Sequence, residues 1–112
     1  EVINKQKLLD RVVHLGEVAL KRLSAFQARC PIIREVRGLG LMIGIELSVD
    51  GRPVVEACRN KRLLINCTQE RVLRLLPAMT ITRAQLDRGL AILEQALSAY
   101  AASRASAARV AS

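Results

Sequence analysis

Residues 33–47 read IREVRGLGLMIGIEL, and this stretch decides the fold. In its second half Leu or Ile recurs at every other position, so that the apolar side chains share one face of an extended chain. Before it, residues 32–37 are rich in β-branched types, and Gly38-Leu39-Gly40 separates the two runs. The pattern predicts two strands, at 32–37 and 41–47, joined by a tight turn in which glycine supplies a positive φ.

Two further strands are predicted downstream, at 63–67 and 72–76, where short apolar runs return. The polar stretch 68–70 between them is typical of a hairpin link, and Pro77 ends the second run. Asp50-Gly51-Arg52-Pro53 indicates a turn, with Pro53 as the first residue of a short helix that reaches about Lys61.

Long amphipathic helices are predicted at both ends of this strand-rich region. From about residue 5 to 28 apolar residues recur every three or four positions, until Pro31 stops the helix. Thr82 and Gln85 have the spacing of a capping box, which predicts the start of a final helix. Its apolar stripe consists of Leu86, Leu90, Leu93 and Leu97.

This order of elements predicts an α+β fold, with a small antiparallel or mixed sheet of about four strands and helices packed on one face. A chain of 112 residues is sufficient for one domain. Its core must be aliphatic, because Phe26 and Tyr100 are its only aromatic residues. We divide it into a connecting helix at 1–30, a sheet domain at 31–100, and an Ala/Ser/Arg-rich tail at 101–112 that is either a fraying helix extension or disordered.

Composition narrows the classes of partner. The net charge of +8 could indicate binding to nucleic acid, but the cations are scattered and aromatic residues for base stacking are scarce, which disfavours that class of partner. The charge instead indicates a solvated basic surface, or a fragment whose acidic counterpart lies elsewhere. No apolar run is long enough for a bilayer and no leader opens the chain, so neither membrane insertion nor secretion is expected. Three widely spaced cysteines without a C-x-x-C pair fit a reducing, cytoplasmic compartment.

Arg74 is the most informative candidate site residue, because it lies inside the apolar run VLRLLP at 72–77. A buried guanidinium without a partner is costly, so we expect it to meet a carboxylate. One alternative is an internal acid such as Glu46 or Glu70. The other is the carboxylate of a small substrate, which a planar and permanently charged guanidinium binds well.

Other candidates carry weaker signals. The turn Arg37-Gly38-Leu39-Gly40 resembles a phosphate cradle only loosely, and a simple turn explains it better. His14 has no acid or cysteine at a useful spacing, and the cysteines are best interpreted as small buried hydrophobic residues. No metal-ligand set and no nucleophile-base arrangement can be assembled from the spacing.

Taken together, residues 33–47, the string LLIN at 63–66 and the string VLRLLP at 72–77 resemble the C-terminal segment of class III aminotransferases. Within that family the resemblance is strongest to acetylornithine and succinylornithine aminotransferases, and it covers residues 8 to 97 in consistent order. It implies the small domain of a fold type I enzyme, normally a homodimer. Such enzymes move an amino group between N-acetylornithine and 2-oxoglutarate through pyridoxal phosphate, in arginine biosynthesis.

The resemblance also implies a role for Arg74, because the family's arginine at this position binds the α-carboxylate of the amino-acid substrate. The Schiff-base lysine and the phosphate-binding groups of the family lie in a large domain upstream, and Lys5, Lys7, Lys21 and Lys61 do not match the lysine motif. We therefore expect this chain to hold no cofactor, to supply no catalytic residue and to be inactive alone. Its expected partners are the large domain, a second copy of the enzyme and the amino-acid substrate.

Some features depart from the family or leave alternatives open. A second proline often follows the position of Pro77, whereas this chain has Ala78-Met79, and the tail has no counterpart that we can assign. The enzyme could instead be an ornithine or 4-aminobutyrate aminotransferase, or the chain a free-standing binding module descended from the domain. If a large domain is missing, apolar surface should be exposed and favour self-association.

Overall fold

The computed structural model describes residues 5–39, 42–58, 63–77 and 81–111. Helix α1 spans Lys5–Gln27, followed by strands β1, Ile33–Leu39, and β2, Met42–Leu47. A short helix α2, Arg52–Ala57, precedes strands β3, Leu63–Thr68, and β4, Val72–Pro77, and helix α3, Arg83–Ala111, ends the described chain. The predicted order of elements is confirmed.

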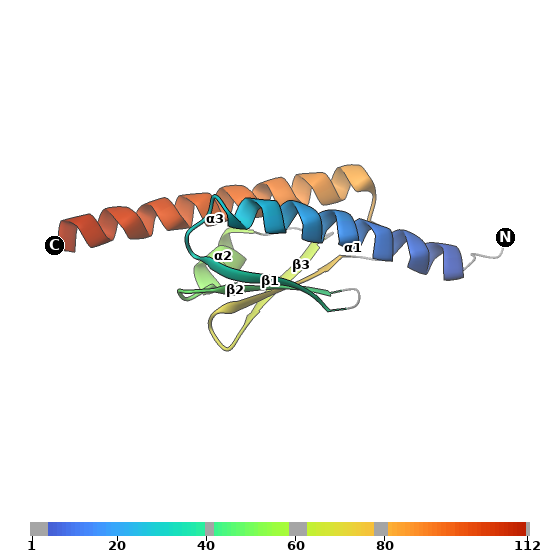
Figure 1. Ribbon diagram of the computed structural model, residues 1–112, viewed down its shortest axis with the longest axis horizontal. Helices are drawn as coiled ribbons and strands as arrows, with labels where there is room; N and C mark the ends of the chain where they lie inside the picture. Colours follow the sequence, from blue (N-terminus) through green and yellow to red (C-terminus); the bar gives the residue numbers. More distant parts are fainter. Residues whose placement is uncertain (1–4, 40–41, 59–62, 78–80, 112) are drawn as a thin grey trace.

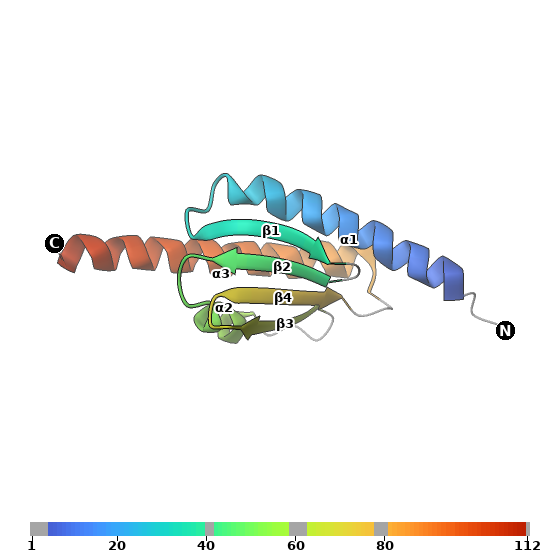
Figure 2. The ribbon, with the colours of Figure 1, turned by 60° about the horizontal axis from the view of Figure 1, so that its bottom comes forward.

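The four strands form one sheet in the order β1-β2-β4-β3, and every neighbouring pair is antiparallel. Figure 1 shows α1 and α3 side by side on one face of this sheet, with α1 extending past it toward the N-terminus and α3 toward the C-terminus. Figure 2 shows the other face, which no helix covers. The structure therefore confirms the α+β prediction, and the sheet is antiparallel rather than mixed.

The core lies between the sheet and the two long helices. It is aliphatic apart from Phe26, as the composition requires, and the predicted stripe of α3 is completely buried at Leu86, Leu90, Leu93 and Leu97. On the sheet, the fully buried members are Ile45 and Leu47 of β2 and Leu73 and Leu75 of β4. Alternation along these strands sends the intervening residues to the uncovered face.

The predicted capping box is present at the start of α3. The Thr82 N–H donates to Oε1 of Gln85 at 2.9 Å, and the Gln85 N–H donates to Oγ1 of Thr82 at 3.1 Å. Farther along, the Tyr100 hydroxyl donates to the Asp50 carbonyl at 2.8 Å and ties α3 to the loop before α2. Helix α3 continues to Ala111, so that residues 101–111 form the helix extension rather than a disordered tail.

Two predicted boundaries were wrong. Gly38 does not belong to a turn, since β1 continues to Leu39, which pairs with Met42, and Gly38 has no positive φ. It is needed for a different reason, because a Cβ there would lie 3.1 Å from Cδ2 of Leu20 on α1. Helix α2 ends at Ala57, before Lys61, because Cys58 has non-helical backbone angles.

Several predictions concern residues outside the described ranges. These are Gly40 and Leu41 of the predicted turn and strand start, the residues between 59 and 62 at the predicted end of the short helix, and Ala78-Met79. Within the described ranges, no helix combines the length and the apolar character that a membrane crossing requires.

Candidate functional site

The uncovered face of the sheet holds Arg74. Its strand neighbours Leu73 and Leu75 are completely buried against the helices, so the side chain of Arg74 points the other way and is exposed. The prediction that this arginine is embedded among apolar residues on both sides is therefore wrong for this chain. Successive side chains of β4 point to opposite faces of the sheet, so Arg74 can stand between two buried leucines without being buried itself.

The two internal acids predicted as structural partners of Arg74 do not pair with it. Oxygens of Glu46 lie 4.0 Å from both Arg34 and Arg37, and Glu70 lies exposed in the turn between β3 and β4. Among the residues that the structure describes, no acid forms an ion pair with Arg74. Its guanidinium is therefore available to a carboxylate from outside the chain.

A row of residues crosses the sheet at the level of Arg74. The register places Arg37 of β1 opposite Gly44 of β2, Gly44 opposite Arg74, and Arg74 opposite Asn66 of β3. Arg37, Arg74 and Asn66 are exposed. With Gly44 they form a row that takes one residue from each of the four strands. The row places two guanidinium groups and an amide on one surface, beside a position without a side chain. We call these four residues the arginine row.

The remaining sequence candidates lie elsewhere. His14 is exposed on α1, on the helical side of the sheet. Cys30 and Cys58 are buried thiols, and burial raises the pKa of each. Cys67 is half-buried and free. The prediction of small buried hydrophobic residues is therefore confirmed for Cys30 and Cys58, whereas Cys67 packs against the core only in part.

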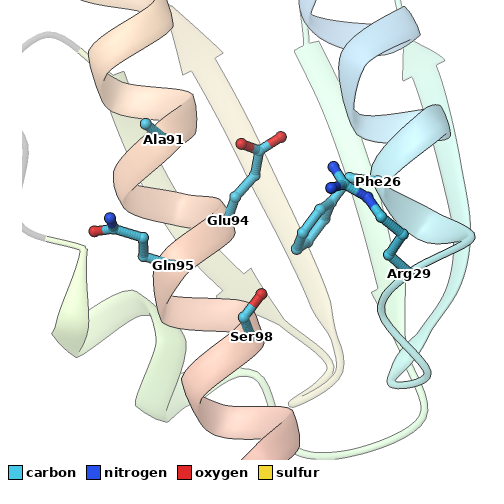
Figure 3. Close-up of a pocket in the computed structure, with 6 residues that line it drawn as sticks. All are labelled: Phe26, Arg29, Ala91, Glu94, Gln95 and Ser98. Atoms are coloured by element: carbon cyan, nitrogen blue, oxygen red, sulfur yellow. The ribbon is translucent and has the colours of Figure 1, made fainter.

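A pocket of about 380 Å³ lies between the end of α1 and the middle of α3. Figure 3 shows its lining, which consists of Phe26, Arg29, Ala91, Glu94, Gln95 and Ser98. The guanidinium of Arg29 stacks 5.4 Å from the centre of the Phe26 ring, and Glu94 is already bound by Arg22 at 2.7 Å. None of the predicted site residues lines it, and it belongs to the helical layer rather than to the uncovered face that holds Arg74.

The described lysines do not fit a pyridoxal phosphate site. Lys7 and Lys21 are exposed on α1, and α1 covers the face of the sheet opposite to Arg74. A Schiff-base lysine must be close to the substrate that it converts, so neither residue can serve an amino acid held by Arg74. Neither lysine is therefore placed to hold the cofactor beside Arg74.

Of the four members of the arginine row, the sequence predicts a functional role only for Arg74 and misses Arg37, Gly44 and Asn66. The predicted strand 32–37 includes Arg37, but as a site candidate Arg37 enters only through the weak phosphate-cradle turn. Gly44 falls on the face of the predicted strand 41–47 opposite to the apolar residues, and a glycine in the middle of a strand often marks a close approach by another group. That glycine was the available signal, whereas the pairing of β2 with β4 was not fixed by sequence.

The fold and this surface can be compared with known proteins. A profile of the family described as Aminotransferase class-III matches residues 1–97. Since this match covers most of the chain, the chain belongs to the class-III aminotransferases. The resemblance predicted from residues 33–47, 63–66 and 72–77 is thereby confirmed.

The relatives that match this chain include acetylornithine and ornithine aminotransferases. The acetylornithine aminotransferase of Methanosarcina mazei is 43% identical over 96 residues, covering 86% of this chain and 24% of that protein. The ornithine aminotransferase of Exiguobacterium sp. is 40% identical over 103 residues, covering 92% of this chain and 25% of that protein. The chain spans about a quarter of the length of the curated relatives it matches.

Solved structures share the fold. The ornithine delta-aminotransferase of Plasmodium falciparum superposes with a TM-score of 0.78 at 25% identity, over 88% of this chain and 27% of that one. The N-acetylornithine aminotransferase of Stenotrophomonas maltophilia superposes with a TM-score of 0.72 at 26% identity, over 87% of this chain and 28% of that one. The elements described above thus correspond to about a quarter of a larger aminotransferase.

Proposed function

We propose that this chain is the C-terminal part of a pyridoxal-phosphate-dependent aminotransferase, in which Arg74 binds the α-carboxylate of the amino-acid substrate. The observation that carries the proposal is the position of Arg74, which is exposed on the only face of the sheet that the helices leave uncovered and has no acid partner among the described residues. A cation without an internal partner is free to bind an anionic ligand.

The strand makes Arg74 a suitable carboxylate anchor. Leu73 and Leu75 are fully buried on either side, so the backbone that carries the arginine is held on a rigid element. The guanidinium can donate two parallel hydrogen bonds to a carboxylate, which fixes its orientation as well as its distance. When bound to the whole enzyme, pyridoxal phosphate supplies the electron sink for amino transfer, and Arg74 contributes substrate binding and orientation.

As amino donor we propose N-acetylornithine, or a related ω-amino acid, with 2-oxoglutarate as acceptor in arginine biosynthesis. Acetylornithine aminotransferases with up to 43% identity to this chain support this choice. The runner-up is ornithine, supported by the Exiguobacterium relative at 40% identity, and 4-aminobutyrate is a further alternative. In this proposal, residues outside this chain bind the side-chain end of the amino donor.

The proposed partners are a large cofactor-binding domain of the same enzyme and, in the whole protein, a second subunit. Two large apolar side chains on α1, Leu9 and Val13, are about 40% exposed, as is Leu76 of β4 next to the arginine row. A domain packed against these surfaces would cover them. The free thiols favour a cytoplasmic location, and without the large domain the chain is inactive in this proposal.

A free-standing binding module is the alternative from a different class. The two proposals differ in what the gene encodes before Glu1. A reading frame that continues upstream into a cofactor-binding domain with a Schiff-base lysine supports the enzyme. An initiator codon directly before Glu1 would favour the module.

The decisive experiment uses the full-length enzyme and the variants Arg74→Lys and Arg74→Gln. We expect the KM for both amino donor and 2-oxoglutarate to rise about tenfold or more, because charge-assisted hydrogen bonds are lost, with a smaller change in kcat. Comparing kcat/KM for N-acetylornithine, ornithine and 4-aminobutyrate in the wild-type enzyme identifies the donor. Unchanged KM values in both variants would contradict the role of Arg74.

A further inference from the structure

Nothing in the described part of the chain requires a glycine at position 44. It lies in the middle of β2 between Ile43 and Ile45, where glycine weakens a strand. Its φ is not positive, and although Gly44 is itself buried, no atom of the described residues lies within 4 Å of the position that a Cβ would take. By contrast, a Cβ at Gly51 would lie 3.0 Å from Leu73, so that glycine is explained by internal packing.

The free space above Gly44 lies between two cations. Arg37 and Arg74 are its register partners on the two neighbouring strands. Their backbones are therefore about 10 Å apart, which is two strand spacings. Arginine side chains are long enough to reach inward from both sides, so both guanidinium groups can approach one anion placed over the glycine. A side chain at position 44 would occupy that space.

The ion pairs of Arg37 within the chain are weak enough to leave its guanidinium available for an anion. Arg37 is half-exposed, and its guanidinium lies 3.9 Å from Glu35 and 4.0 Å from Glu46. Both distances exceed the 2.7–2.9 Å or so of a charge-assisted hydrogen bond. These acids therefore keep Arg37 on the uncovered face without saturating its donors. Asn66, on the far side of Arg74, adds an exposed amide to the same row.

We infer that Gly44 is a substrate-binding position, which keeps open a carboxylate subsite that Arg37 and Arg74 share. This inference rests on the proposed function and deepens it, because it adds a second guanidinium and a size limit to the binding of the substrate carboxylate. Gly44 acts by leaving space, and Arg37 acts by charge. The ligand class is the α-carboxylate that amino acids and 2-oxo acids have in common.

The experiment measures KM, kcat and the unfolding temperature of the full-length enzyme with Gly44→Ala and Gly44→Leu. Since the Cβ position is open, we expect the unfolding temperature to stay unchanged or rise. The KM for both amino donor and oxo acid should rise, by about tenfold for leucine and less for alanine, if one charged hydrogen-bonding contact is lost. If the leucine variant does not fold, the alanine variant decides.

Arg37 is tested with a matched control. Arg37→Gln should raise both KM values severalfold, and Arg37→Lys should restore part of the loss, because the charge returns without the planar fork. Arg34→Gln is the control, since Arg34 also lies 4.0 Å from Glu46 but is not in the arginine row. It should leave both KM values unchanged.

The results separate this inference from the proposed function. If Arg74→Gln raises KM while Gly44→Leu folds normally and keeps the wild-type KM, the shared subsite is wrong and the role of Arg74 stands. An equal rise in KM for Arg34→Gln and Arg37→Gln would also overturn the inference, because it would reflect only the loss of surface charge. If Arg74→Gln has no effect, both proposals fail.

Discussion

The two faces of the sheet have opposite chemistry although the same four strands supply both. On the covered face, side chains such as Ile45, Leu73 and Leu75 are fully buried under α1 and α3. On the uncovered face the same strands carry Arg37, Arg74 and exposed acids. One face therefore provides the packing that holds the domain together, and the other is left to charged groups that have little to do with its stability.

The difference also appears in how polar groups are satisfied. Within the described ranges no charged or polar residue is buried, and no buried side-chain polar atom lacks a hydrogen-bond partner. On the helical side, Arg22 binds Glu94 through two hydrogen bonds of 2.7 and 3.0 Å, and these raise the pKa of Arg22. Arg74 has no such partner, which is what a binding residue requires.

The largest predicted effect compares two adjacent leucines on β4. Leu75 is fully buried and Leu76 is 44% exposed on the opposite face. Leu75→Ala should lower the free energy of unfolding by about 2–5 kcal/mol, because it leaves a cavity in the core. Leu76→Ala should change it by no more than about 0.5 kcal/mol in this chain. Urea unfolding monitored by circular dichroism measures both, and similar losses would show that the uncovered face also stabilises the domain.

A smaller effect compares a paired cation with an unpaired one. Arg22→Gln should lower the free energy of unfolding by about 1 kcal/mol, because the part-buried Glu94 loses a bidentate partner. Arg74→Gln should leave stability unchanged or raise it slightly, since it removes an unpaired positive charge from a chain of net charge +8. The same unfolding assay at low and moderate salt checks both. A loss in Arg74→Gln equal to that in Arg22→Gln would contradict the contrast.

The smallest effect concerns the turn between β3 and β4, at the edge between the covered and the uncovered face. Gln69 and Glu70 have positive φ angles of 52° and 67°, which are unfavourable for residues other than glycine, asparagine and aspartate. Gln69→Asn combined with Glu70→Gly should raise the free energy of unfolding by about 0.5 kcal/mol, because the added flexibility of glycine in the unfolded chain offsets part of the relieved strain. Glu70→Ala is the control and should give no gain. No gain in the double variant would mean that the turn relaxes at little cost.

Much of the fold could be predicted because its signals are local. The capping box at Thr82, the stripe of α3 and the alternation in β2 depend only on residues close together in sequence, and each appears as predicted. The boundary that failed at Gly38 involves a distant contact. Gly38 is set by Leu20 of α1, and no local pattern reports that contact.

The candidate site was predicted only in part. Arg74 was identified from its unusual surroundings and from the family resemblance, but its expected burial was wrong, and of the two alternatives for its partner the internal acids Glu46 and Glu70 do not pair with it. Arg37 and Gly44 could not be placed beside it, because residues 37 and 74 come together only through the pairing of β2 with β1 and β4. Strand order is a long-range property that periodicity does not encode.

The sequence alone determined the strands and helices, the aliphatic core and the family, because these follow from periodicity, capping and motif order along a short stretch of chain. Only the tertiary structure decided which face of the sheet the helices cover, and hence that Arg74 is exposed and lies in one row with Arg37 and Gly44. The physical reason is that the run VLRLLP carries apolar residues on both faces of its strand, so periodicity does not say which face the helices cover. Packing between segments far apart in the chain makes that choice.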